Sequence, residues 1–268
     1  MSAPIRLSVR RARQPSLVGS QLLVVPVTEN DLASGALKML DRALGGGLLR
    51  HVRDASFRAQ ASRTLVHRAP ANGRSTAVAL VGLGKAQEAT SDTWRRAGGA
   101  AAATARGEAA LDVAVHVFED EAENTVAFAE GFALMLYRFD TYRRPDPERR
   151  REPRKLVVTG PSLDSRLLGR ELDALSTTVE AVFAVRDLVN EPPSAKSAAV
   201  LARRAVALCR GSGVRVEVLG PTEIRRLKLN GLLAVNRGSV DPPRFLRLRY
   251  RPRGRVRSRV ALVGKGIT

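Results

Sequence analysis

Short apolar runs alternate with longer segments of helical periodicity over residues 4–160. The run over residues 22–27 is apolar throughout, which is typical of a strand in a sheet that is covered on both faces. Further strands are expected over residues 4–9, 64–67, 76–82, 111–118 and 155–159, and helices over residues 30–44, 91–106 and 121–137. Because strands that alternate with helices fold into layers, we predict that residues 1–160 form an α/β domain.

A long helical pattern follows over residues 164–189, and Pro192 and Pro193 end it. We predict that residues 161–195 hold a helix that connects two domains. The alternation then restarts, with helices expected over residues 197–210 and 221–227 and strands over residues 214–219, 232–235, 245–250 and 256–263. The last two strands are expected to form a hairpin, and residues 196–268 are predicted to be the start of a second α/β domain.

The chain carries a net charge of +19, and 39 of its 45 basic residues are arginine. Arginine stands at every odd position from Arg247 to Arg259, so one face of an extended strand there would be wholly cationic. Such a face attracts phosphate polymers, which makes nucleic acid a candidate partner. A GC-rich coding sequence also leaves arginine on solvated strand faces, and this alternative stays open.

Several classes of protein lack their signature in this sequence. No apolar run has the length of a membrane span, and residues 1–6 do not begin a secretory signal, so a cytoplasmic protein without a membrane partner is expected. Cys209 is the only cysteine, which excludes an internal disulfide. His51, His67 and His116 stand far apart and show no ligand spacing, so we expect no zinc site from them.

The turn Gly82-Leu-Gly-Lys85 could present backbone N–H groups to an anion. It lacks the spacing of a P-loop, and the alternative is a tight turn with an exposed lysine. No residue is therefore assigned to cofactor binding.

Lys265 stands between Gly264 and Gly266, directly after the apolar run over residues 260–263. Sites in open α/β sheets collect at the carboxyl ends of strands, and glycine neighbours let another group approach the backbone closely. An amine can give up its proton and offer a lone pair to a metal ion, which a guanidinium effectively cannot do. In a chain with only six lysines, this position predicts a chemical role for Lys265.

Four ordered blocks of the chain resemble the leucyl aminopeptidases, also called cytosol aminopeptidases. Residues 260–268 resemble the start of that family's Val-Gly-Lys-Gly-Ile-Thr-Phe-Asp-Ser-Gly-Gly motif, and residues 186–192 resemble its Arg-Asp-Leu-Val-Asn-x-Pro segment. The other blocks lie within residues 233–250 and, nearer the N-terminus, at residues 81–85 and 130–142.

The resemblance implies an N-terminal macro-like domain of three layers, a linking helix and a catalytic domain, assembled as a homohexamer. It implies two divalent metal ions, Mn²⁺ or Zn²⁺, and the release of N-terminal amino acids from peptide substrates. Lys265 matches the family's lysine metal ligand.

The family's carboxylate ligands and its other catalytic residues lie beyond Thr268, so no catalytic residue is assigned in this chain. One nitrogen ligand cannot hold a metal pair that needs several oxygen donors. We therefore expect the 268-residue chain alone to bind no metal tightly and to be inactive. The alternative function is that of a non-catalytic, basic macro-like module that binds a phosphate ligand or nucleic acid.

Overall fold

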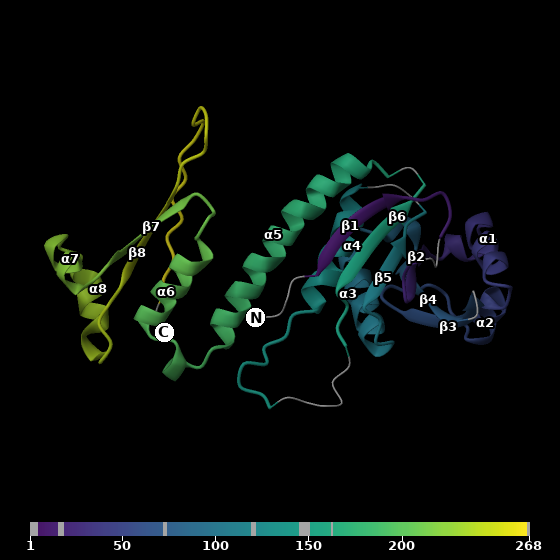
Figure 1. The fold of residues 1–268 in the computed structure, drawn as a ribbon, viewed down its shortest axis with the longest axis horizontal. Helices are drawn as coiled ribbons and strands as arrows, with labels where there is room; N and C mark the ends of the chain where they lie inside the picture. The colour runs from purple at the N-terminus through teal and green to yellow at the C-terminus, as the bar shows by residue number, and fades with distance from the viewer. Residues whose placement is uncertain are drawn as a thin grey trace. The chain divides into compact units, whose positions relative to one another are not determined.

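A computed structural model describes residues 5–15, 19–71, 74–118, 122–144, 151–161 and 163–266. The chain divides into two compact units, unit 1 (Met1–Val185) and unit 2 (Arg186–Thr268), both traced in Figure 1.

The described residues of unit 1 form a six-stranded sheet in the order β1-β6-β5-β2-β4-β3 (Figure 1). Its strands are β1 (Arg6–Arg11), β2 (Leu22–Thr28), β3 (Thr64–Ala71), β4 (Arg74–Gly84), β5 (Asp112–His116) and β6 (Lys155–Gly160). Neighbouring strands from β1 to β4 in this order run parallel, and β3 pairs antiparallel with β4 at one edge. The carboxyl ends of the parallel strands therefore lie along one edge of the sheet.

Helices pack on both faces of this sheet. The helices are α1 (Gly35–Ala43) and α2 (Leu48–Asp54) on one face, and α3 (Ser91–Gly107), α4 (Ala122–Met135) and α5 (Ser165–Asn190) on the other. Along β2, Leu22 and Val24 belong to the core under α3, α4 and α5, while Leu23 and Val25 belong to the core under α1 and α2. A strand buried on both faces needs an unbroken apolar run. The predicted α/β domain of three layers is confirmed.

Helices α3 and α4 approach each other closely through glycine. A Cβ atom added to Gly98 would lie 2.0 Å from the carbonyl oxygen of Phe128, and one added to Gly131 would lie 1.8 Å from that of Arg95. Backbone atoms at these distances leave no room for a side chain. Gly98 of α3 and Gly131 of α4 are therefore required by this packing.

The predicted helix over residues 30–44 begins later than expected. Residues Asn30–Ala33 form a 3-10 turn, and α1 begins after Ser34, whose hydroxyl accepts a hydrogen bond from the Leu37 amide at 3.2 Å. The carboxylate of Asp31 accepts instead from the amide and the hydroxyl of Thr28, each at 2.7 Å. Helix α2 was not predicted, because its seven residues are too short for a clear periodic pattern.

The first part of α5 belongs to unit 1. Its apolar stripe is buried in the core of that unit, at Leu168, Leu172, Leu175, Val179 and Phe183. The predicted connector, residues 161–195, is therefore not a separate element, and the division between the units falls inside the helix after Val185. No helix in the described part of the chain is both long and apolar enough to span a membrane.

Unit 2 contains a two-stranded antiparallel sheet and several short helices. These are α6 (Ala198–Leu208), β7 (Val214–Leu219), α7 (Pro221–Arg226), α8 (Asn230–Val235) and β8 (Phe245–Tyr250).

Two strand predictions in unit 2 are wrong. Residues 232–235 lie in α8, because an apolar run of four residues suits a helix as well as a strand. Residues 256–263 form no strand and no hairpin with β8, which pairs with β7. Leu262 and Val263 are almost fully exposed, and no strand of the described residues pairs with them through backbone hydrogen bonds.

Candidate functional site

Lys265 lies exposed in the segment that follows β8. A Cβ atom added to its neighbour Gly266 would lie 3.6 Å from the Leu201 side chain, so the segment passes α6 at this point. Among the described residues, no group of three or more His, Cys, Asp or Glu side chains could hold a metal ion. Lys265 offers one nitrogen donor, and the part of the chain that the structure describes does not by itself supply the further donors that a metal pair needs.

The structure gives the glycines of the turn at residues 82–85 a packing role. The Gly82 amide donates to the Arg63 carbonyl at 2.8 Å, and the Gly84 amide donates to the Ala59 carbonyl at 2.7 Å. A Cβ atom on Gly82 would lie 2.1 Å from the carbonyl oxygen of Gln60. These two amides are satisfied internally and do not form a cradle for an anion.

Lys85, at the end of this turn, is paired with an acid. Its ammonium group donates to the Glu88 carboxylate at 3.0 Å, and this hydrogen bond raises the pKa of Lys85. This segment is therefore a tight turn with an exposed lysine, which was the alternative to an anion site.

Two of the three histidines lie together, which the sequence spacing did not indicate. His51 on α2 and His67 on β3 have ring centroids 5.6 Å apart. Burial lowers the pKa of His67, the charge of His51 lowers it further, and Asp41 acts in the opposite direction. The contact joins two different elements, so no spacing rule along the chain could have found it.

His116 is buried at the end of β5, where it is only 1% exposed. The Thr159 hydroxyl donates to the Val115 carbonyl at 3.0 Å, and its oxygen lies 3.1 Å from Nδ1 of His116. A hydroxyl has one proton to donate, so Nδ1 of His116 is the donor in this contact. The histidine thus links β5 to β6 in the core.

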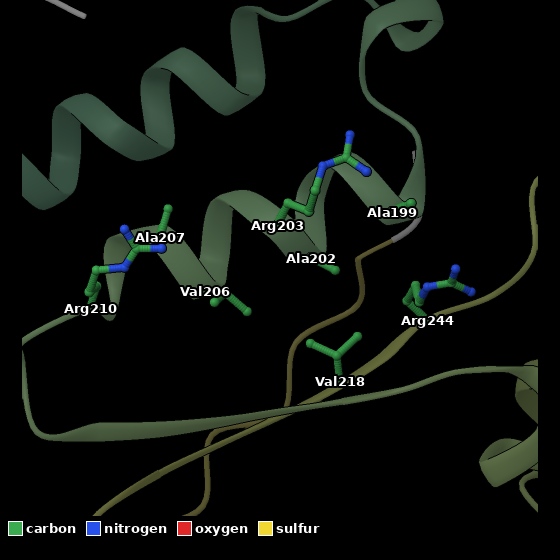
Figure 2. A pocket seen from close by; sticks show the side chains of 8 residues that line it. All are labelled: Ala199, Ala202, Arg203, Val206, Ala207, Arg210, Val218 and Arg244. Carbon is green, nitrogen blue, oxygen red and sulfur yellow. The ribbon is translucent and has the colours of Figure 1, made fainter.

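A pocket of about 430 Å³ lies between α6 and β7 in unit 2 (Figure 2). Its lining residues are Ala199, Ala202, Arg203, Val206, Ala207, Arg210, Val218 and Arg244. Alanine and valine side chains form an apolar floor, and no acidic residue lines it. Figure 2 shows the guanidinium groups of Arg203, Arg210 and Arg244 at separate places around that floor, not converging on one point. This lining favours an anionic ligand.

A second pocket, of about 360 Å³, lies among α3, α4 and α5 in unit 1. It is lined by Ser91, Arg95, Ala122, Glu123, Val126, Ala127, Glu130, Leu167 and Glu171. Nε of Arg95 donates to the Glu130 carboxylate at 2.7 Å, and this bond raises the pKa of Arg95. The guanidinium group in this pocket is therefore already paired within the protein.

Two sequence models of the cytosol aminopeptidase family match the chain. The model of the N-terminal domain matches residues 24–146, and the model of the catalytic domain matches residues 183–268. Together they cover well over half of the chain.

Curated relatives align along most or all of this chain. A protein named probable cytosol aminopeptidase from Rhizobium etli strain CFN 42 is 34% identical over 274 residues, which take in 100% of this chain and 53% of the relative. Its namesake from Geotalea uraniireducens is 34% identical over 233 residues, 85% of this chain and 47% of that protein. The chain spans about half the length of the curated relatives it matches.

Solved structures with a similar fold include a leucine aminopeptidase and a maturation enzyme. A mutant of tomato leucine aminopeptidase superposes with a TM-score of 0.80 and 25% identity, over 95% of this chain and 53% of that one. The bottromycin maturation enzyme BotP, in complex with Mn, superposes with a TM-score of 0.68 and 28% identity, over 87% of this chain and 45% of BotP.

Proposed function

The chain belongs to the cytosol aminopeptidase family, and from that premise we propose that it serves a metal-dependent aminopeptidase that releases N-terminal amino acids from peptides. The observation that carries this proposal is the match of the catalytic-domain model to residues 183–268, a stretch that includes Lys265. Because the chain spans about half the length of its relatives, the activity is proposed for a polypeptide of their length.

Lys265 is proposed as one ligand of the metal. Its side chain is exposed and stands between two glycines, so a metal ion and further donors can approach it. The amine must release its proton to bind, so this ligation weakens as the pH falls. The remaining donors are proposed to come from the half of the relatives' length that this chain does not span. Mn, named in the structure of BotP, is the first metal to test.

A substitution at Lys265 tests the assignment. In the full-length protein, Lys265→Met removes the donor, and Lys265→Arg keeps the positive charge without an available lone pair. Both variants should lose activity on a chromogenic leucine anilide by about 100-fold or more, and both should need more Mn²⁺ for half-maximal activity. Lys38→Met is the matched control, because Lys38 is an exposed lysine on α1, and it should keep full activity.

The possible results test the role of Lys265 as a metal ligand separately from the proposed aminopeptidase activity. Full activity in Lys265→Met would remove Lys265 from the metal site and leave the aminopeptidase proposal in place. A full-length parent protein that releases no amino acid with any divalent metal would overturn the function itself.

Two further properties follow from the family resemblance as proposals, a cytoplasmic location and a homo-oligomer, with the homohexamer as the expected form. Sedimentation equilibrium of the full-length protein tests the second, and a monomeric mass would contradict it. The matches give no support to the alternative of a non-catalytic module.

A further inference from the structure

Most of the net positive charge of the chain lies in unit 2. Residues 186–268 hold 19 lysine and arginine residues against five aspartate and glutamate residues, which gives a net charge of +14 out of the total of +19. Unit 1 holds 26 basic and 21 acidic residues. Codon bias raises arginine throughout a chain, but it does not deplete acidic residues from one unit. Codon bias alone therefore does not account for the charge of unit 2.

The β7–β8 sheet places like charges opposite each other. Its register pairs Arg215 with Arg249 and Glu217 with Arg247. Arg247 is neutralised by an ion pair with Glu217, whereas no carboxylate among the described residues pairs with Arg215 or Arg249. Like charges directly opposite each other destabilise a strand pair. A bound anion would relieve that repulsion.

The segment after β8 concentrates further arginines, and we call residues 251–259 the arginine loop. All of its side chains are exposed, and its arginines are Arg251, Arg253, Arg255, Arg257 and Arg259. The chain reverses direction within this loop (Figure 1), and Gly254 has a φ of 125° that favours glycine. Both arms of the loop therefore present guanidinium groups to solvent.

The pocket between α6 and β7 adds three spaced guanidinium groups to the same unit. In Figure 2, Arg203, Arg210 and Arg244 do not converge, so they do not enclose one compact anion. Spaced cations suit a polymer that offers a phosphate at regular intervals. A guanidinium group also binds a phosphate through two parallel hydrogen bonds.

We propose that unit 2 binds the phosphate backbone of nucleic acid through the arginine loop, Arg215, Arg249 and the arginines around the α6–β7 pocket. Binding through phosphates is independent of base sequence. Nucleic acid is favoured over an anionic membrane because the positions between the loop arginines are mostly Pro, Gly and Ser, with Val256 as one apolar side chain. Peripheral membrane segments need a larger apolar face.

The proposal is tested by measuring how the full-length protein binds a short, fluorescently labelled DNA duplex at several salt concentrations. Binding is followed by fluorescence anisotropy. The loop variant changes the five loop arginines to glutamine. A matched control changes five exposed arginines of unit 1 to glutamine, namely Arg42, Arg50, Arg53, Arg58 and Arg63. Neither set forms an ion pair among the described residues, so both variants should fold.

The parent protein should bind the duplex at about 50 mM salt and release it steeply toward about 200 mM. The loop variant should bind at least about 10-fold more weakly at low salt, and the slope of log K against log salt should fall by up to about 4.5, at about 0.9 per lost phosphate contact. The control should change the slope of log K against log salt by less than about 0.9, the value for one phosphate contact.

Three results would overturn the proposal. They are no duplex binding by the parent at low salt, equal losses in the loop variant and the control, or binding to phosphatidylserine vesicles without binding to the duplex. Aminopeptidase activity is measured in the same preparations and should not change in the loop variant, so this test does not depend on the proposed function.

Discussion

At the scale of single residues, the packing of α3 on α4 depends on Gly98. An alanine there would place its Cβ 2.0 Å from the carbonyl oxygen of Phe128, and a backbone atom in a packed core cannot move away freely. Gly98→Ala should therefore lower the free energy of unfolding by about 2 kcal/mol or more.

Gly99→Ala is the control on the same helix. Its Cβ would lie 3.8 Å from the Gly131 carbonyl, an ordinary contact, and alanine is favoured over glycine in a helix by about 1 kcal/mol. Urea unfolding should show Gly99→Ala at least as stable as the parent. Equal stability of the two alanine variants would contradict the close approach of the helices.

His67 provides a residue-scale prediction about pH. Its pKa lies below the ordinary 6.5, so below that pH the unfolded chain binds more protons than the folded chain. The free energy of unfolding should therefore fall as the pH drops from 6.5 toward the lower pKa of folded His67, and above pH 6.5 this loss is absent. His51→Ala removes a neighbouring positive charge and should raise the pKa of His67, measured by NMR titration.

Asp41→Asn tests the opposite sign at the same place. The change removes the negative charge that raises the pKa of His67, so that pKa should fall further, while the amide oxygen can still accept the hydrogen bond from the Leu49 amide. A pKa of His67 that responds to neither substitution would mean that the two rings are not neighbours in solution.

At the scale of elements, the start of α5 depends on Asp164. Its carboxylate accepts from the amides of Leu167 and Arg166 at 3.0 and 2.9 Å, and these bonds lower its pKa below the ordinary 3.8. A lowered carboxyl pKa contributes stability that is present above the ordinary value and is lost as the pH falls through the folded value. Asp164→Ala should therefore destabilise unit 1 at neutral pH, and the difference from the parent should shrink in acid.

Asp164→Asn separates the cap from the charge. Asparagine keeps the acceptor, so it should retain more stability than alanine at neutral pH. Urea midpoints of the three proteins at neutral and acid pH check this. If the urea midpoints of the parent and of Asp164→Ala differ by the same amount at both pH values, the ionised carboxylate of Asp164 does not stabilise the helix start.

Elements with long patterns could be predicted from the sequence. The run at β2 is apolar throughout because both faces of the strand are buried, and the stripe of α5 persists because it lies on one core for several turns. Short patterns failed. The four apolar residues 232–235 fit a strand or a helix equally well. In the structure they lie in α8, which packs against α7. The apolar run at residues 260–263 predicts a strand, but a strand also needs partners, which the described residues do not provide.

Sequence can indicate candidate site residues where neighbours along the chain carry the signal. The signal at Lys265 comes from its two flanking glycines, which are local, and its role as a metal ligand stays a prediction. The contact of His51 with His67 joins a helix to a strand, and the α6–β7 pocket gathers side chains from separate elements. Gly82 and Gly84 suggested an anion site from their residue type alone. In the structure their amides donate hydrogen bonds to the backbone carbonyls of residues 59 and 63.

At the scale of the whole molecule, the two units differ in core and in charge. Unit 1 has buried apolar layers on both faces of its sheet and nearly balanced charge, whereas unit 2 has few buried side chains and a net charge of +14. The family matches run through both units and into the segment of Lys265. Peptide hydrolysis therefore stays a proposal for a polypeptide of the relatives' length, and polyanion binding is proposed separately for unit 2.

The proposal of a metal-dependent aminopeptidase is tested most directly by the release of leucine from a leucyl peptide by the full-length protein. We expect release by the purified protein, its loss after treatment with a chelator, and its recovery when Mn²⁺ is added back. A protein that releases no leucine with metal present, or that works equally well in the chelator, would contradict the assignment.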